Sequence, residues 1–376
     1  MTSEQSHICS SARTSMVDLF AGPGGLDVAA HWLGVSAHGV EWDANACATR
    51  RAAGLGTTQG DVRNFGPAHF PEATVLAGGP PCQTFTVAGT GAGRRALDQV
   101  LALVKRMAAG ENISATLAEL DDERTGLVLE PLRWALSAAN LGRPYKAIVL
   151  EQVPAVLPVW SAVREALETI GYQADHGILH TEEFGVPQTR RRAILIASLD
   201  RKPRLPRPTH HRFRKGVPRG EGGEKLLPWE TMEEALSRPG SFTVISNYGT
   251  GGDPKARGRR RSDEPAATVT GKIRRNRLVG AYEESERFSL HEAGRLQTFP
   301  IDYPWSGNDI AQQIGNAIPP RLAAHVLAEA LDLPLDSKVL DAAVKASWHG
   351  PSRPRSDERG GPVDLGQAAA MAPAGR

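Results

Sequence analysis

The chain has 376 residues, of which 40% are hydrophobic and 23% charged, and its formal net charge is +2. These values are typical of a water-soluble globular protein with one large domain and a smaller one. No apolar run is long enough to cross a membrane, the first residues lack the basic and apolar regions of a signal peptide, and the three cysteines show neither a disulfide framework nor zinc-ligand spacing, so we expect a reduced, cytoplasmic protein without a metal.

The N-terminal half predicts alternating strands and helices. The expected strands cover 16–20, 35–40, a short stretch that ends at Asp61, 73–77, 147–150 and 192–197. A glycine-rich turn is expected over 21–25, and helices over 26–33 and 43–53. This alternation predicts an α/β fold with a doubly wound, mostly parallel sheet and helices on both faces.

Four chemically capable side chains follow the ends of predicted strands. They are Glu41, Asp61, Cys82 and Glu151. Ligands of parallel sheets bind outside the carboxyl ends of the strands, so we expect these side chains to share one edge. Cys82 follows two prolines, which fix φ and remove backbone donors. A structural thiol is the commoner role of a lone cysteine, and the shared edge favours a reactive one here.

The glycine-rich turn allows a ligand to approach the backbone closely. Asp27 stands where a dinucleotide fingerprint has its third glycine, which counts against a nicotinamide-dependent oxidoreductase. Glu41 is placed to bind the two hydroxyls of a ribose, and Asp61 to accept a bond from an exocyclic amine. Trp42 could stack on a base or fill the core. Without a P-loop lysine, this set indicates an adenosine-containing cofactor.

Charge is unevenly distributed along the chain. Residues 201–277 carry 19 Lys and Arg against 8 Asp and Glu, whereas the rest carries 25 against 34. A basic segment on an acidic body indicates a binder of phosphate backbones, and a solvated linker is the alternative. Within this segment only 242–245 and 267–270 predict strands.

The remaining segments divide into a long connection, a closing helix and two tails. Between Gln83 and Asp122 we expect a functional lid, with a mobile part over 89–95 and a partly helical part over 101–120. A helix is expected over 321–331 after two prolines. Disordered tails are expected over 1–13 and 346–376. Cys47 is expected to be a helix-core thiol rather than a ligand.

Six motifs resemble those of the DNA (cytosine-5) methyltransferase family. In order they are DLFAGPGG at 18–25, PPCQ at 80–83, EQV at 151–153, QTRRR at 188–192, RFSLHEAGRLQ at 287–297 and QIGNAIPP at 313–320. Six matches in family order over roughly residues 16–330 are specific, although each alone is weak. The resemblance implies a Rossmann-like methyltransferase fold with a smaller, basic target-recognition domain. Gln152 replaces the family's usual asparagine, so we expect altered loop geometry near Glu151 with activity retained.

The resemblance implies transfer of a methyl group from S-adenosylmethionine to carbon 5 of cytosine, with S-adenosylhomocysteine as product. A thiolate that adds to carbon 6 makes carbon 5 nucleophilic, and this role falls to Cys82. Glu151 would supply a proton or hydrogen bond at ring nitrogen 3. Arg192, and with weaker support Arg190, would hold the carbonyl oxygen of the base and lower the pKa of the thiol. The base must be flipped out of the duplex.

The same resemblance assigns cofactor-binding residues position by position. They are Phe20, Gly22, Gly24, Gly25, Glu41, Trp42, Asp61, Val62, Pro80, Leu127, Asn316 and Ala317. Leu127 ends the sequence DERTGL at 122–127, which is similar to a family motif that opens a helix beneath the cofactor. No metal is implied.

Double-stranded DNA is the expected partner. The recognition domain would cover 201–300, between a catalytic domain over 14–200 and a C-terminal segment over 301–345 that returns to it. Basic side chains contact phosphates, and arginine pairs bidentately with guanine. Candidate DNA contacts are Gln83, Arg257, Arg259, Arg260, Arg261, Arg274, Arg275 and Arg277. We expect a monomer that works in a restriction–modification system with a cognate endonuclease, or as an orphan or phage-borne enzyme.

Two alternatives stay open. One branch of the family methylates tRNA, and the long basic segment favours DNA instead. A non-catalytic nucleic-acid-binding relative is disfavoured because Cys82, Glu151 and Arg192 are all present.

Overall fold

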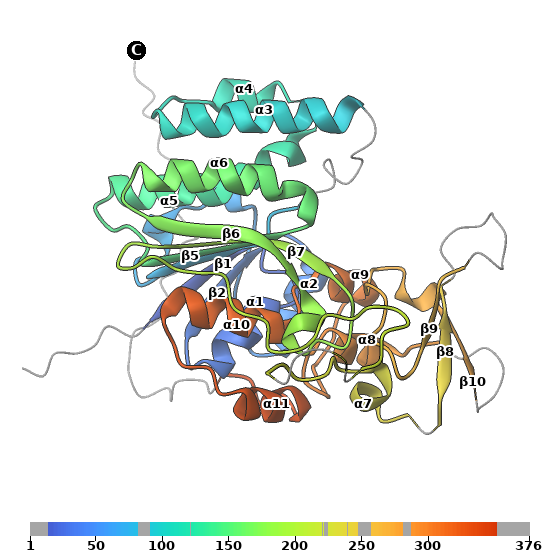
Figure 1. Cartoon of the computed structure of the whole chain (residues 1–376). Helices are drawn as coiled ribbons and strands as arrows, with labels where there is room; N and C mark the ends of the chain where they lie inside the picture. Colours follow the sequence, from blue (N-terminus) through green and yellow to red (C-terminus); the bar gives the residue numbers. More distant parts are fainter. Residues whose placement is uncertain are drawn as a thin grey trace, which may run out of the picture.

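The computed structural model describes residues 14–81, 91–120, 122–219, 221, 225–238, 240–246, 257–280 and 287–351. A large sheet lies at the centre of the molecule, with helices on both faces and a smaller lobe to one side (Figure 1). Its strands run in the order β3-β2-β1-β4-β5-β7-β6. They are β1 (Ser15–Leu19), β2 (Ser36–Glu41), β3 (Gly56–Gln59), β4 (Val75–Gly78), β5 (Ala147–Gln152), β6 (Gln173–His180) and β7 (Arg191–Ser198).

Strand directions explain which residues reach the carboxyl edge. The strands β3, β2, β1, β4 and β5 pair in parallel, whereas β7 runs antiparallel to both β5 and β6. The start of β7 therefore lies beside the end of β5, and Gln152 pairs with Ala193 there. Strand order reverses between β1 and β4, which is the position where doubly wound sheets bind ligands. The predicted fold class is confirmed; β6 was not predicted from the sequence.

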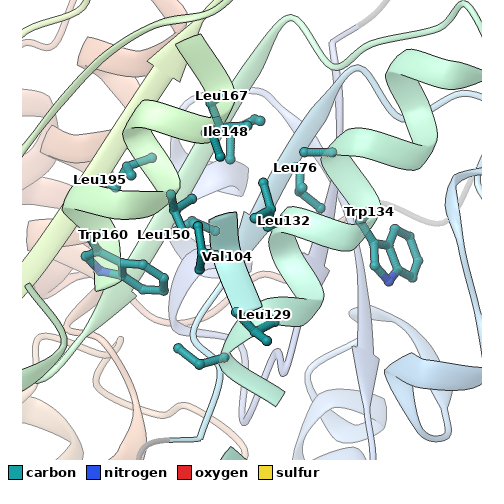
Figure 2. Close-up of a cluster of buried hydrophobic side chains, with 14 of the residues drawn as sticks. Leu76, Val104, Leu129, Leu132, Trp134, Ile148, Leu150, Trp160, Leu167 and Leu195 are labelled. Atoms are coloured by element: carbon teal, nitrogen blue, oxygen red, sulfur yellow. The ribbon is translucent and has the colours of Figure 1, made fainter. Parts of the chain in front are cut away.

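Two apolar layers cover the sheet. One face packs against α1 (Gly25–Trp32) and α10 (Pro320–Leu331), the helix expected after two prolines. The other packs against α5 (Glu130–Asn140) and α6 (Leu157–Glu168), and α3 (Gly91–Ala108) adds a further layer over α6 (Figure 1). Figure 2 shows Leu132, Ile148 and Leu167 among the side chains that fill this second face.

Shorter elements complete the large lobe. The helix α2 (Ala44–Ala52) begins at Asp43, whose side chain accepts a bond from the Ala46 amide at 2.8 Å, and α4 (Ser114–Ala118) follows α3. Short 3₁₀ helices are η1 (Val62–Asn64), η2 (Pro67–His69), η3 (Glu123–Leu129), η4 (Pro154–Val156), η5 (Thr181–Phe184) and η7 (Ile273–Arg275). The mobile loop expected over 89–95 is wrong for residues 91–95, because α3 begins at Gly91. Residues 82–90 lie outside the described part of the chain.

The smaller lobe contains a second sheet with the strand order β10-β8-β9. Its elements are α7 (Met232–Leu236), β8 (Phe242–Ile245), β9 (Arg259–Arg261), β10 (Arg277–Gly280), α8 (Leu290–Leu296) and α9 (Ile310–Asn316). The strand expected over 242–245 is confirmed, and the one expected over 267–270 is wrong. The polar groups of Thr268 and Val269 are instead satisfied by Gln188, Thr189 and Arg190.

The C-terminal segment stays packed against the large lobe beyond residue 345, where the expected disordered tail would begin. A helix not predicted from the sequence, α11 (Ser337–Lys345), is followed by Trp348, whose indole nitrogen donates to the Ala53 carbonyl at 2.9 Å. The disordered tail expected from residue 346 is therefore corrected for residues up to 351. Residues 1–13 and 352–376 lie outside the described part. Of the helices that the structure describes, none has the length and apolarity needed to cross a membrane.

Two buried histidines predict a loss of stability in acid. His210 and His325 are 2% and 7% exposed, and burial, followed by the charge of Arg321, lowers their pKa values to about 4 and about 3. Below pH 6.5 the unfolded chain binds protons at these sites that the folded chain does not, so stability falls as the pH falls.

Between pH 6.5 and pH 5, we expect the free energy of unfolding of His325→Gln to fall by about 1–2 kcal/mol less than that of the wild-type chain, as measured by urea unfolding. Equal losses in the two proteins would contradict this assignment.

Candidate active site

The carboxyl edge of the large sheet gathers most of the side chains singled out in the sequence. Glu41 ends β2, Asp61 follows β3, and Glu151 lies at the end of β5. Arg192 joins them from the start of the antiparallel β7. Cys82 lies outside the described residues, but the chain leads to it from β4 through Gly79, whose amide bonds the Leu19 carbonyl at 3.2 Å.

The glycine-rich turn bends sharply between β1 and α1. Positive φ angles occur at Phe20 (59°), Gly22 (54°) and Gly24 (105°). A Cβ atom at Gly22 would meet nothing within 4 Å, so the space above the turn is open. At Gly25 a Cβ atom would lie 2.3 Å from the Ile318 carbonyl oxygen, which only glycine avoids. This turn can therefore receive a ligand on one side while it packs tightly on the other.

Glu41 is fixed toward the glycine-rich turn by two backbone amides. Its Oε2 accepts from the Gly22 amide and its Oε1 from the Asp43 amide, each at 2.7 Å. Burial raises the pKa of Glu41, and these two bonds act in the opposite direction. Each carboxylate oxygen keeps further acceptor capacity, which suits a ribose diol. Beside it, Trp42 is 70% exposed, so it is a free stacking surface rather than core filler.

Asp61 is held in place by hydrogen bonds from Arg63. Its Oδ1 accepts from the Arg63 amide at 2.9 Å, and its Oδ2 pairs with the Arg63 guanidinium at 2.6 Å. The side-chain bond with Arg63 is the largest cause that lowers the pKa of Asp61. The lowered pKa favours the ionised carboxylate, whose two oxygens are both acceptors, and this suits a bond from an exocyclic amine. Val62, which follows it, is buried.

The remaining predicted cofactor residues lie on three separate segments. Leu127 is half-buried in η3, a 3₁₀ helix that begins directly after Asp122 and is followed by α5, so a helix opens at this motif as expected. Asn316 is exposed at the end of α9 and accepts from Gln312 at 2.7 Å. Ala317 follows it, and Pro80 follows β4. An exposed aromatic surface, a positioned carboxylate and an open turn together fit an adenosine-containing cofactor.

A buried ion pair lies directly beneath the glycine-rich turn. The guanidinium of Arg50 donates to both oxygens of Asp27 at 2.7 Å, and both side chains are 0% exposed. Asp18 lies beside them; burial, and secondly the charge of Asp27, raises the pKa of Asp18 well above its usual range. Burial therefore favours the neutral form of Asp18, and Asp27 is the partner that forms the ion pair with Arg50.

Arg50→Met is expected to lower the free energy of unfolding by about 3–5 kcal/mol, because the Asp27 carboxylate would stay buried without its cation. The matched control is Arg51→Met on the exposed side of the same helix, which should change stability by less than about 0.5 kcal/mol. Urea unfolding of the three proteins measures both values. A loss below about 1 kcal/mol for Arg50→Met would contradict the account.

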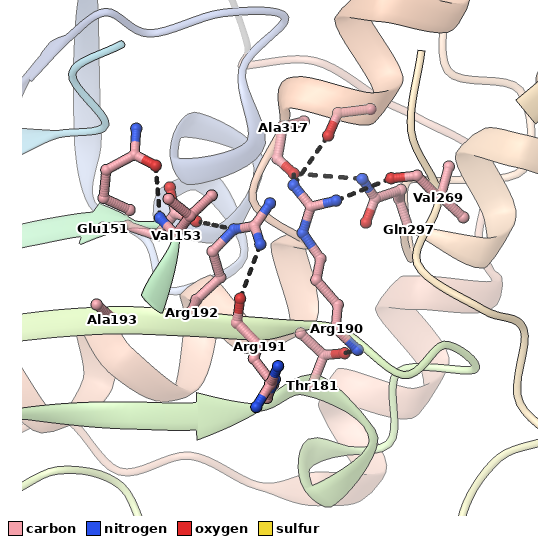
Figure 3. Close-up of polar contacts among 12 residues, drawn as sticks. Glu151, Val153, Thr181, Arg190, Arg191, Arg192, Ala193, Val269, Gln297 and Ala317 are labelled. Atoms are coloured by element: carbon pink, nitrogen blue, oxygen red, sulfur yellow. Dashed lines mark hydrogen bonds and ion pairs between the residues drawn. The ribbon is translucent and has the colours of Figure 1, made fainter. Parts of the chain in front are cut away.

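Glu151 and Arg192 form an ion pair at the ends of two neighbouring strands, β5 and β7. The Nε atom of Arg192 lies 2.5 Å from Oε1 of Glu151, and the two side chains are 12% and 8% exposed (Figure 3). A Cβ atom at Gly79 would lie 3.3 Å from Oε2 of Glu151, so the strand end that leads to Cys82 passes against this carboxylate. The site thus holds a carboxyl group and a cation next to the start of the segment that contains Cys82.

Gln152 links the same two strand ends. Its amide nitrogen donates to the carbonyl of Pro80, and its amide oxygen accepts from the Val153 amide at 2.5 Å. The longer side chain at this position therefore still connects β5 to the segment before Cys82. Nothing in this arrangement turns Glu151 away from the sheet edge.

Arg190 does not lie where a base-contacting residue is expected, and its predicted catalytic role is revised. It is 2% exposed, and its guanidinium donates to the carbonyls of Val269, Gly315 and Ala317 at 2.9, 2.9 and 3.1 Å (Figure 3). Two of these carbonyls belong to the C-terminal end of α9, where a cation is favourable. Burial is the main cause that lowers the pKa of Arg190. This residue joins the two lobes.

Sequence reasoning missed the partners of Arg190 at the lobe junction. Gln188 donates to the Leu296 carbonyl at 3.0 Å and to Gln297 Oε1 at 2.7 Å, and Gln297 donates to the Ile314 carbonyl at 2.6 Å. Both glutamines are 0% exposed. They fall within the QTRRR and RFSLHEAGRLQ motifs. These motifs were interpreted only as catalytic, although they also contain residues that connect the two lobes.

Four of the candidate DNA-contacting arginines lie on the two faces of the small sheet. Arg259 and Arg277 both pair with Ile245, from opposite neighbouring strands, and Arg261 lies two residues along β9, so all three share one face. Arg260 points to the other face, where its guanidinium lies 4.5 Å from the ring of Phe213. Elsewhere, Arg257 is half-buried, Arg274 and Arg275 are exposed in η7, and Gln83 lies outside the described residues.

Comparison with known proteins gives one consistent family. The family model described as C-5 cytosine-specific DNA methylase matches residues 14–105, 118–234 and 224–331. The chain is 29% identical over 351 residues to the Type II methyltransferase M1.HphI of Haemophilus parahaemolyticus, covering 84% of this chain and 86% of that protein. Identity to M.NgoFVII of Neisseria gonorrhoeae, also a Type II methyltransferase, is 26% over 348 residues, covering 83% and 85%.

Solved structures show the same fold at low identity. The Dnmt2 methyltransferase of S. pombe aligns with a TM-score of 0.57 and 16% identity, covering 85% of this chain and 99% of that one. The Entamoeba histolytica methyltransferase EhMeth aligns with a TM-score of 0.57 and 14% identity, covering 85% and 98%.

Proposed function

Because this chain belongs to the family of C-5 cytosine-specific DNA methylases, we propose that it methylates carbon 5 of a cytosine extruded from duplex DNA through a covalent adduct with Cys82. The family match confirms the identification as a DNA (cytosine-5) methyltransferase made from the motifs. The observation that carries the mechanism is the Glu151–Arg192 pair, 2.5 Å apart, beside the strand end that leads to Cys82.

Cys82 would start the reaction as a thiolate that adds to carbon 6 of the cytosine ring. Electron density then moves toward carbon 5 and ring nitrogen 3. Glu151 would hold a proton at nitrogen 3, and Arg192, which is ion-paired with Glu151, would hold the carbonyl oxygen of the base. After carbon 5 has gained its methyl group, loss of the carbon 5 proton and departure of the Cys82 thiolate restore the ring.

S-adenosylmethionine, the methyl donor that the family implies, would supply an electrophilic sulfonium methyl group. Glu41 would bind its ribose, and Trp42 and Asp61 its adenine. These residues lie over β2 and β3, whereas Glu151 and Arg192 lie over β5 and β7, with β1 and β4 between them. A donor and a base bound by these two groups of residues would meet at the middle of the carboxyl edge, beyond the ends of β1 and β4.

DNA contact is proposed for the face of the small sheet that carries Arg259, Arg261 and Arg277. Ile245 and Val279 lie on the same face as these arginines. Ile245 is partly exposed and Val279 is 49% exposed, so this face is open to solvent. Arg261 pairs with Asp263 at 2.8 Å, and both are exposed enough to exchange partners when a phosphate approaches. Arg260, stacked on Phe213, is assigned a packing role instead.

The substrate is tested by offering the purified chain duplex DNA and tRNA with labelled S-adenosylmethionine. We expect label in duplex DNA at 5-methylcytosine, and sequencing of methylated positions in DNA from cells expressing the chain should give one short recognition sequence. Label in tRNA alone would favour the tRNA branch, and no label in either would favour a non-catalytic relative. The names of the Type II relatives favour a modification enzyme of a restriction–modification system.

A further inference from the structure

A buried tyrosine from the C-terminal part of the chain supports the glycine-rich turn from below. The hydroxyl of Tyr303 donates to the carbonyl of Pro23 at 2.5 Å, across a sequence separation of 280 residues. Tyr303 is 0% exposed, and burial raises the pKa of its hydroxyl, so the hydroxyl stays protonated and can donate this hydrogen bond. A bond between groups so distant in the sequence fixes the turn relative to the body.

The ring of Tyr303 is itself held rigidly. Its centroid lies 4.8 Å from that of Phe299, 4.9 Å from that of Trp305 and 5.5 Å from that of Trp348. Aromatic contacts of this spacing stabilise one ring orientation. The packed aromatic rings therefore hold the hydroxyl next to the Pro23 carbonyl.

The turn rests on this hydroxyl and on the neighbouring ion pair. A Cβ atom at Gly24 would lie 3.0 Å from the Tyr303 hydroxyl oxygen, and Arg50 donates to the Ala21 carbonyl at 3.4 Å. The opposite side of the turn is open at Gly22. Two of the turn's carbonyls are thus fixed from beneath, while its other side stays available.

We infer that Tyr303 is a positioning residue for the cofactor, which holds the Pro23 carbonyl so that the glycine-rich turn already has its binding shape before S-adenosylmethionine arrives. The inference rests on the proposed function. Without the hydroxyl, the Pro23 carbonyl loses its partner, and the turn must be ordered during binding at the expense of affinity.

Tyr303→Phe removes only the hydroxyl and keeps the packed ring, so the variant should fold. The chain offers a matched control in Tyr172, which is 2% exposed and whose hydroxyl donates to the Tyr145 carbonyl at 2.6 Å. Tyr172 immediately precedes β6, whose first residue pairs with Ser198 at the end of β7, so it lies at the edge of the sheet opposite the turn. Both replacements remove one buried hydroxyl with a backbone partner.

The test is calorimetric titration of the full chain with S-adenosylhomocysteine, together with thermal unfolding of each protein. We expect the dissociation constant to rise about three- to tenfold in Tyr303→Phe and to stay within about 1.5-fold in Tyr172→Phe, although both lose thermal stability. In turnover assays the KM for S-adenosylmethionine should rise by the same factor in Tyr303→Phe, with kcat at saturation unchanged.

Unchanged affinity in Tyr303→Phe, or an equal loss in Tyr172→Phe, would reduce Tyr303 to a general structural role and overturn the inference. Failure of the wild-type chain to bind S-adenosylhomocysteine is a different result. It would refute the proposed cofactor, and the inference with it.

Discussion

Replacement of Cys82 by alanine is expected to reduce kcat for DNA methylation by at least about 10⁴-fold while duplex binding is retained. Carbon 5 of cytosine gains nucleophilic character only when a thiolate adds to carbon 6, and alanine offers no atom for that addition. Binding should survive because the arginines proposed to contact DNA lie on the small lobe. Single-turnover methyl transfer and a duplex-binding titration measure the two properties separately.

Cys47→Ala is the matched control for this experiment. Cys47 is buried in α2, where its thiol contacts the Glu41 carbonyl at 3.5 Å, as expected of a helix-core thiol. The control should keep methyl transfer within about threefold of the wild-type rate. Substantial activity in Cys82→Ala would remove this residue from the mechanism, whatever the control does.

Glu151→Gln is expected to lower the rate of methyl transfer by about 10²–10⁴-fold, with affinity for S-adenosylhomocysteine unchanged within about twofold. Glutamine keeps the shape of the side chain but cannot transfer a proton to ring nitrogen 3, and it leaves Arg192 without its carboxylate partner at 2.5 Å. Cofactor affinity should persist because β4 separates Glu151 from the glycine-rich turn. Single-turnover rates at saturating DNA, with calorimetry for the cofactor, test both statements.

Glu182→Gln makes the same chemical change at another buried carboxyl group. Glu182 is 3% exposed in η5 after β6, and burial raises its pKa to about 7. It has no assigned part in the reaction, so its replacement should leave the methyl-transfer rate within about threefold. If Glu151→Gln behaved like Glu182→Gln, the proton donor would have to be sought elsewhere.

The sheet edge could be predicted because its signals are local. Short predicted strands that end near Glu41, Asp61 and Glu151 indicated a parallel sheet, and the rule that ligands bind at the carboxyl ends of its strands placed these side chains together. The helix over 26–33 and the helix after Pro320 followed from equally local patterns. The structure places Glu41 and Glu151 at that edge in agreement with these expectations.

What could not be predicted depends on contacts between distant segments. Arg190 reads in sequence like Arg192, and only the folded chain shows its guanidinium bound to carbonyls of Val269, Gly315 and Ala317. The alanine, valine and threonines over 267–270 resemble a strand, but Thr268 and Val269 form hydrogen bonds that involve side chains with residues 188–190. The strand β9 consists of three arginines, which carry no apolar alternation to reveal it.

The most direct test of the mechanism uses duplex DNA that contains 5-fluorocytosine at the target position, incubated with the chain and S-adenosylmethionine. Fluorine at carbon 5 cannot leave as a proton does, so the reaction should stop at the covalent stage. We predict a stable protein–DNA adduct whose peptide mass maps to Cys82, and no adduct with Cys82→Ala. The absence of an adduct from a chain that methylates ordinary duplex DNA, or an adduct at another residue, would contradict the account.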